Sequence, residues 1–115
     1  MKRGEVYWAD LAPRSGAEQR GRRPVLVLSH DAFNQTPRWK SIIVVPLSTS
    51  SAQAARGPTV VGLPAGVAGL LRASAVVCHQ VTTLDRAKLS RRIGALPPNL
   101  LSVVEDALKA ALDLS

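Results

Sequence analysis

Short apolar runs of strand length, separated by prolines, glycines and polar clusters, constrain most strongly what this chain can fold into. The sequence predicts strands over residues 5–11, 25–29, 41–47, 59–63, 74–84 and 91–96, with helical turns over 31–34 and 85–88. A longer helix is predicted after Pro97 and Pro98, because apolar residues recur at helical spacing from Leu100 to Leu112. This pattern favours a mainly β fold, a small half-open β-barrel that the C-terminal helix closes.

Length and cysteine content set the class of protein. A chain of 115 residues fits one domain, residues 1–115. Its single cysteine, Cys78, lies in an apolar run, which indicates a buried thiol in a reducing compartment. No apolar run approaches the ~20 residues of a membrane span, and Glu5 and Asp10 interrupt the stretch that a signal peptide would need. We therefore expect a cytoplasmic protein that does not enter the membrane.

The charge is strongly basic and unevenly distributed. The formal net charge is +7, and residues 85–95 hold four basic side chains against one acidic side chain, whereas the last twenty residues are net acidic. Such an asymmetry predicts a basic face that binds polyanions, with nucleic acid as the first candidate. The four aromatic residues do not form a recognisable base-stacking pattern, so contacts to phosphates, sugars and base edges are expected to dominate.

The stretch from Glu18 to Ser29 joins a basic loop to a buried strand. Arg20, Arg22 and Arg23 lie in the loop half, and Val25 to Leu28 form the apolar half. Pro24 is predicted to be the first residue of the strand, because its fixed φ and missing N–H suit that position. Arg23 at this junction would be a positioned phosphate binder. The alternative is a solvated basic loop without a binding role.

The sequence offers little for metal, cofactor or protein-nucleophile chemistry. His30 and His79 are far apart, the acidic residues are isolated, and the chain has neither a P-loop nor a dinucleotide fingerprint. We therefore expect no metal and no cofactor. RNA cleavage needs neither, because the 2′-OH next to the scissile phosphate is the nucleophile and an arginine can stabilise the phosphorane. Hydroxyls over residues 48–51 could donate to such a ligand or simply cap the strand end.

The sequence resembles the MazF/PemK family of toxin endoribonucleases over nearly its whole length. The matching segments are residues 3–11, Gly16, 18–19, 23–29, Asn34, 43–48, 69–70, 77–81, 83–86, Leu89 and 107–108. The resemblance implies an SH3-like barrel, a homodimer, and metal-independent cleavage of single-stranded RNA to 2′,3′-cyclic phosphate and 5′-OH ends. It also implies a cognate antitoxin, whose acidic extended segment lies over the dimer.

The resemblance assigns roles to individual residues. The family's catalytic arginine matches Arg23, and its catalytic threonine matches Ser48, with Thr49 adjacent as the alternative hydroxyl. The residues predicted to bind substrate are Glu18, Gln19, Arg20, Thr49, Gln80 and Arg86. Arg72 departs from the family, because relatives often carry an acidic residue before the serine that matches Ser74. This change makes the rim of the site more basic.

Two alternatives remain at this point. A gyrase-poisoning toxin of the CcdB type shares the fold but cuts nothing, and a nucleic-acid-binding module would bind without catalysis. The basic loop and the pairing of Arg23 with Ser48 favour the nuclease.

Overall fold

The computed structural model describes residues 1–11, 21–49 and 57–115. The strands are β1 (Glu5–Leu11), β2 (Gly21–Val27), β3 (Ser41–Ser48), β4 (Val60–Leu63), β5 (Ser74–Val77), β6 (Thr82–Asp85) and β7 (Leu89–Ala95). The helices are α1 (Asp31–Asn34) and α3 (Pro98–Leu112), and short 3-10 turns form η1 (Val67–Gly69), η2 (Cys78–Gln80) and η3 (Arg86–Lys88). The predicted mainly β class with a C-terminal helix is confirmed.

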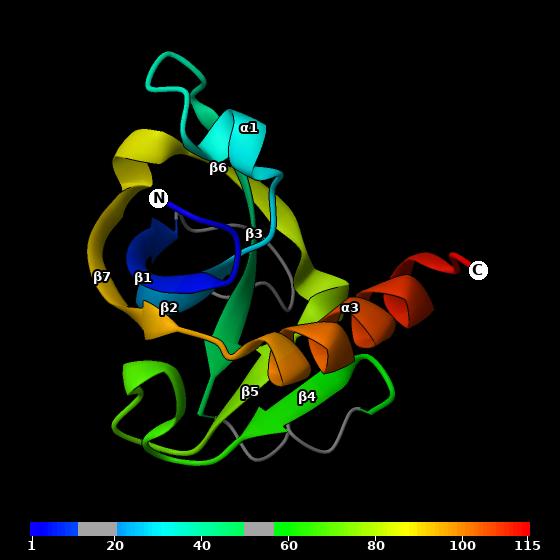
Figure 1. Cartoon of the computed structure of the whole chain (residues 1–115). Coiled ribbons are helices and arrows are strands. Elements are labelled where there is room, and N and C mark those ends of the chain that lie inside the picture. The colour runs from blue at the N-terminus through cyan, green and yellow to red at the C-terminus, as the bar shows by residue number, and fades with distance from the viewer. Residues whose placement is uncertain (12–20, 50–56) are drawn as a thin grey trace.

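The strands pair antiparallel in the order β4-β5-β3-β2-β1-β7, with β6 beside the first half of β3. Within the described part of the chain β4 and β7 do not pair with each other, so the curled sheet is a half-open barrel (Figure 1). The helix α3 packs against β4 and η2. None of the described helices has the length and apolar character needed to span a membrane.

The sheet separates two apolar cores. Successive side chains on β2 and β3 alternate between them, because neighbouring strand residues point to opposite faces. Leu26 and Val45 enter the larger core, where Val104 of α3 also lies, and Val25 and Val44 enter the smaller one. All five are almost completely buried, which explains why the β2 and β3 segments read as continuous apolar runs.

Pro46 marks a change of partner along β3, as its missing N–H predicts. One edge of β3 pairs with β6 from Ser41 to Val44 and with β5 only from Leu47 onward. On the other edge Pro46 lies opposite Val25 of β2. The proline therefore sits where one side of the strand needs no ladder donor.

The prediction of one long strand over 74–84 is wrong. β5 ends at Val77, η2 turns the chain over residues 78–80, and β6 begins at Thr82. The break has a topological cause, because β5 and β6 pair with different halves of the same strand. The apolar run continues through the turn because Cys78 is itself buried in the larger core. Burial raises the pKa of this thiol to about 11, in line with the expected buried cysteine.

The predicted start of the second strand is also wrong. β2 begins at Gly21 rather than Val25, because β1 continues to Leu11 and pairs residue by residue as far as Gly21. Arg22 and Arg23 are therefore strand residues, and Pro24 lies inside the strand.

The predicted turns at 31–34 and after Asp85 are confirmed as α1 and η3, and the Asp85 carboxylate accepts a hydrogen bond from the Ala87 N–H.

Candidate functional site

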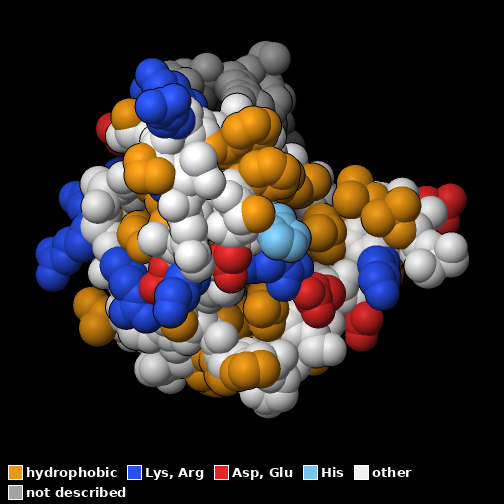
Figure 2. All heavy atoms as spheres, turned by 45° about the horizontal axis from the view of Figure 1, so that its top comes forward, with side chains coloured by type: hydrophobic (Ala, Val, Ile, Leu, Met, Phe, Trp, Pro, Cys, Tyr) orange, Lys and Arg blue, Asp and Glu red, His pale blue; other side chains and the backbone are white. Residues whose placement is uncertain are grey.

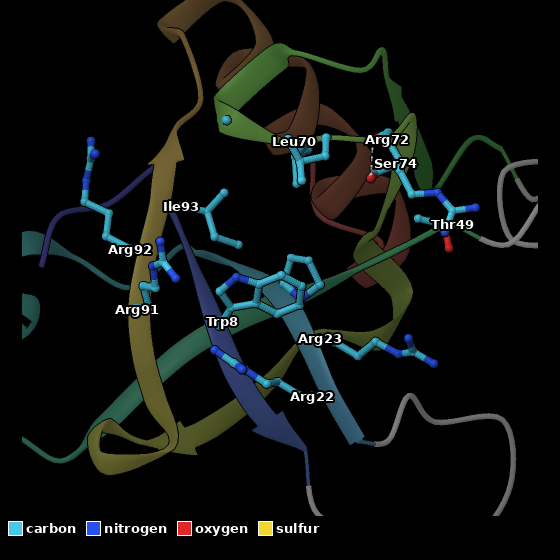
Figure 3. Close-up of a pocket in the computed structure, with 13 residues that line it drawn as sticks. Trp8, Arg22, Arg23, Thr49, Leu70, Arg72, Ser74, Arg91, Arg92 and Ile93 are labelled. Atoms are coloured by element: carbon cyan, nitrogen blue, oxygen red, sulfur yellow. Dashed lines mark hydrogen bonds between the residues drawn. The ribbon is translucent and has the colours of Figure 1, made fainter.

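A pocket of about 560 Å³ opens where β1, β2 and β7 meet the loop after η1. Its described lining consists of Trp8, Arg22, Arg23, Pro24, Thr49, Gly69, Leu70, Leu71, Arg72, Ser74, Arg91, Arg92 and Ile93. Five of these side chains are arginines and none is acidic. Trp8 lies at the centre, with Arg23, Arg72 and Thr49 on one side and Arg91 and Arg92 on the other (Figure 3). The pocket therefore suits an anionic ligand that has an apolar part.

The register of β1 and β2 places the arginines. Trp8 lies opposite Pro24 and Asp10 opposite Arg22, so Trp8 and Arg22 share one face of the sheet. Arg23 lies opposite Ala9, and β2 pairs with β3 only from Val25 onward. Among the described strands, this stretch of β2 pairs with β1 alone, and the Arg23 side chain is one of those that line the pocket.

The opposite wall comes from an unusually close approach between two backbones. A Cβ on Gly94 of β7 would come closer than 3.0 Å to the backbone of Ala68, and a Cβ on Gly69 would come equally close to the Ile93 carbonyl. Gly69 also has a φ of +75°, a conformation that glycine adopts most readily. The two glycines bring Leu70 and Arg72 over the pocket.

The arginines of the pocket differ in what engages them. The Arg92 Nε donates to the Glu5 carboxylate at 2.6 Å, and the guanidinium of Arg22 lies 5.1 Å from the centre of the Trp8 ring. Within the described part of the chain, no ion pair or hydrogen bond engages the side chains of Arg23, Arg72 or Arg91. Nothing in the described part of the structure therefore occupies these three guanidinium groups.

Glu5 belongs to the frame of the pocket. Burial raises the pKa of this carboxyl, but hydrogen bonds from Arg92, the Lys2 N–H and Tyr7 outweigh burial and hold the pKa below its ordinary value. The carboxylate therefore stays charged and holds the side chain of Arg92, a residue of β7, through the ion pair. Two further acidic residues, Glu105 and Asp106, lie on α3, which is at the right of Figure 2, as the acidic C-terminal segment predicts.

Of the two candidate hydroxyls, the structure brings Thr49 to the pocket. Thr49 is exposed and lines the pocket together with Arg23. Ser48 is buried at the end of β3, where it pairs with Ala75, and it is not among the lining residues. Ser74 adds a second hydroxyl to the lining, although its Oγ donates to the Arg72 carbonyl at 3.0 Å.

Comparison with known proteins identifies the family. The model of the PemK-like, MazF-like toxins of type II toxin-antitoxin systems matches residues 2–112. The chain belongs to this toxin family. It is 39% identical to the endoribonuclease MazF6 of Mycobacterium tuberculosis over 99% of this chain and 98% of that protein. Its identity to the endoribonuclease EndoA of Bacillus subtilis is 38%, over 99% and 96%.

A solved structure extends the comparison to a complex. An endoribonuclease from a mycobacterial species, determined with its cognate antitoxin, superposes with a TM-score of 0.75 at 26% identity. The match covers 100% of this chain and 95% of that one. The half-open barrel described above is therefore the fold of MazF-like toxins.

The other predicted site residues of this MazF-like toxin lie elsewhere or outside the described ranges. Glu18, Gln19 and Arg20 fall in residues 12–20, outside the described part of the chain. Gln80 is half-buried in η2 and is not among the described lining residues. Arg86 donates to the carbonyls of Trp39, Phe33 and Thr36 at 2.9–3.1 Å, so its guanidinium holds the loop after α1.

Sequence reasoning missed the central residue of the pocket. Trp8 was not singled out, and the aromatic residues showed no stacking pattern in the sequence. The available signal was the alternation in β1, where Trp8 stands between buried Val6 and exposed Asp10 on one face of the strand. A large aromatic side chain at such a boundary is half in the core and half in a cleft.

The described residues contain no group of three or more His, Cys, Asp or Glu side chains that could hold a metal ion.

Proposed function

We propose that this MazF-like toxin is an endoribonuclease that cuts single-stranded RNA at specific sequences without a metal ion. The observation that carries the proposal is that the Arg23 guanidinium, which no described residue engages, lines the same arginine-rich pocket as the Thr49 hydroxyl. Near-full-length identity of 38–39% to two named endoribonucleases supports it.

The reaction uses the RNA as its own nucleophile. The 2′-oxygen attacks the adjacent phosphorus, the bond from phosphorus to the 5′-oxygen breaks, and the 2′-OH proton is balanced by a proton delivered to the leaving oxygen. The products are a 2′,3′-cyclic phosphate and a 5′-OH. Arg23 acts as a stabiliser of the phosphorane and not as a base, because an arginine guanidinium offers N–H donors and no acceptor for a proton.

The hydroxyl that donates to the phosphorane is proposed to be that of Thr49 instead of Ser48. Its position in the lining with Arg23 supports this choice, whereas Ser48 is buried in β3. Glu18, Gln19, Arg20 and Gln80 are proposed to contact the RNA beyond the pocket. We propose that Arg86 supports the loop after α1, because its three carbonyl contacts favour that role over substrate binding.

The same surface is proposed to receive the antitoxin. A MazF-like relative forms a complex with its cognate antitoxin, and an acidic extended segment would complement the arginine pocket. We further propose a homodimer in the cytoplasm, where RNA is accessible. Light scattering at micromolar concentration tests the dimer, and a monomer would contradict it.

Cleavage of matched strands tests the activity. Purified toxin is incubated in EDTA with an RNA and with an all-2′-deoxy strand of the same sequence. We expect cleavage of the RNA only, and cutting of the deoxy strand would exclude the 2′-OH mechanism. Because the proposed cutting is sequence-specific, an RNA pool of random sequence that stays wholly intact would instead favour a toxin that acts on a protein.

Arginine variants test the site. Arg23→Ala should lower kcat by about 10²- to 10³-fold, as loss of one transition-state donor typically does. Arg23→Lys should not rescue it, because lysine lacks the bidentate fork. Arg38→Ala is the control, since it removes the same charge from an exposed residue outside the lining. A loss of binding equal to the loss of turnover in Arg23→Ala would indicate a binding module.

A further inference from the structure

The indole of Trp8 forms the floor of the pocket without being buried in the core. Its side chain is half-buried, while the residues before and after it on the same face are a fully buried valine and an exposed aspartate. Arg22 lies over the ring, with its guanidinium 5.1 Å from the ring centre. A cation at this distance holds an aromatic ring in place through the ring quadrupole.

Apolar side chains face this ring across the pocket. Leu70 and Ile93 both line the wall opposite Trp8, and the arginines stand around them at the rim (Figure 3). The pocket therefore has an apolar part, lined by Trp8, Leu70 and Ile93, with positive charge around it. A nucleotide has the matching composition, because its base is flat and apolar on both faces whereas its phosphates are anionic.

We propose that Trp8 is the stacking platform for one nucleobase of the bound RNA, next to the phosphate that Arg23 holds. The proposal rests on the proposed function and adds to it the residue that positions the substrate. Stacking on an aromatic ring accepts any base, because every base has a π face. Trp8 would therefore set where the strand is bound, while other contacts set which sequence is cut.

The two tryptophans of the chain allow a direct measurement. Trp39 lies outside the described lining of the pocket, stacked on Phe33 with ring centres 4.6 Å apart. A Trp39→Phe protein thus reports on Trp8 alone, and a Trp8→Phe protein reports on Trp39 alone. The probe is the all-2′-deoxy strand, which lacks the attacking hydroxyl and can be titrated to saturation.

We expect the deoxy strand to quench the emission of the Trp39→Phe protein by half or more and to leave the Trp8→Phe protein unchanged. Abasic substitution, one position at a time, should then weaken binding of the wild-type toxin by about 5- to 150-fold at a single position. In Trp8→Leu that position should lose its effect, whereas Trp39→Leu should retain it.

The outcomes separate this proposal from the proposed function. RNA cleavage by the wild type with unchanged Trp8 emission on strand binding overturns the stacking platform and leaves the nuclease intact. Quenching by an antitoxin peptide but not by the strand would also overturn the stacking platform, since the apolar part of the pocket would then bind a protein side chain. Strand binding with quenching but no RNA cleavage would overturn the nuclease and retain the platform. Because the quenching measurement keeps Trp8 in place, it does not depend on whether Trp8→Leu folds.

Discussion

The close approach of β7 to the η1 loop gives the sharpest test of how the pocket is built. In Gly94→Ala the new Cβ would meet the Ala68 backbone at under 3.0 Å, and β7 or the loop must retreat by roughly 1 Å to restore ordinary contact. Both partners are backbone, so no side chain can move aside. Overpacking of this kind typically destabilises by about 1–3 kcal/mol, and we expect about 2–3 here.

Three other glycines separate the loss of stability caused by a steric clash from the loss caused by a positive φ. Gly69→Ala combines the same kind of clash with a φ of +75°, which should bring its cost to about 3–4 kcal/mol. Gly66 has a φ of +93° but nothing within 4 Å of its Cβ, so Gly66→Ala should cost only about 1–2 kcal/mol. Gly62 has neither constraint, and Gly62→Ala should be neutral or slightly stabilising.

Urea unfolding followed by circular dichroism measures the series. For a small domain the expected loss in Gly94→Ala lowers the midpoint by roughly 1–2 M relative to wild type, with an unchanged m-value. If Gly94→Ala unfolds at the same urea concentration as Gly62→Ala, the loop does not rest on β7 as described. The wall formed by Leu70 and Arg72 would then lose its structural basis.

The remaining predictions concern the site and its frame. Thr49→Ala should lower kcat by about 10-fold or more while Thr49→Ser stays within a few-fold, and a larger loss in Ser48→Ala, measured on folded protein, would reassign the hydroxyl. Arg86→Lys should lower stability by about 1–2 kcal/mol with KM unchanged, and a raised KM at unchanged stability would restore its predicted role in substrate binding. The pKa of Glu5 is lower in the folded than in the unfolded state, so its contribution is present above the ordinary value of 4.5 and is lost as pH falls through the folded pKa. Glu5→Gln should therefore destabilise the toxin at pH 7 and less so at pH 3, and an equal effect at both pH values would show that the charge on Glu5 is irrelevant.

Local patterns in the sequence were sufficient for most of the fold. The apolar periodicity of α3, its opening by two prolines and the partner change at Pro46 each depend on residues that are neighbours in the chain. The failures came where distant segments decide. The strand predicted over 74–84 is broken because its two halves pair with opposite ends of β3, and nothing local reveals that division. Likewise, β2 begins early because β1 extends to meet it.

Local sequence patterns were also insufficient to predict the whole candidate site. Arg23 could be singled out because it directly precedes Pro24 and a buried strand, and the resemblance agreed. Trp8 could not, because its place in the pocket depends on a loop that η1 brings across more than sixty residues of sequence. The choice between Ser48 and Thr49 likewise turns on which of the two side chains lines the pocket.

The net charge alone does not locate the proposed binding surface of this toxin, because its arginines have two different roles. Arg3 donates to the Leu28 carbonyl and pairs with Glu105 of α3, Arg92 pairs with Glu5, and both are thereby engaged in holding the fold. Arg23 and Arg91 have no such partner within the described residues. A guanidinium that is already neutralised adds little to the field felt by a phosphate, whereas an unengaged one acts at full strength. The proposed binding surface therefore combines Trp8 with two pocket arginines, Arg23 and Arg91, that no ion pair or hydrogen bond occupies within the described residues.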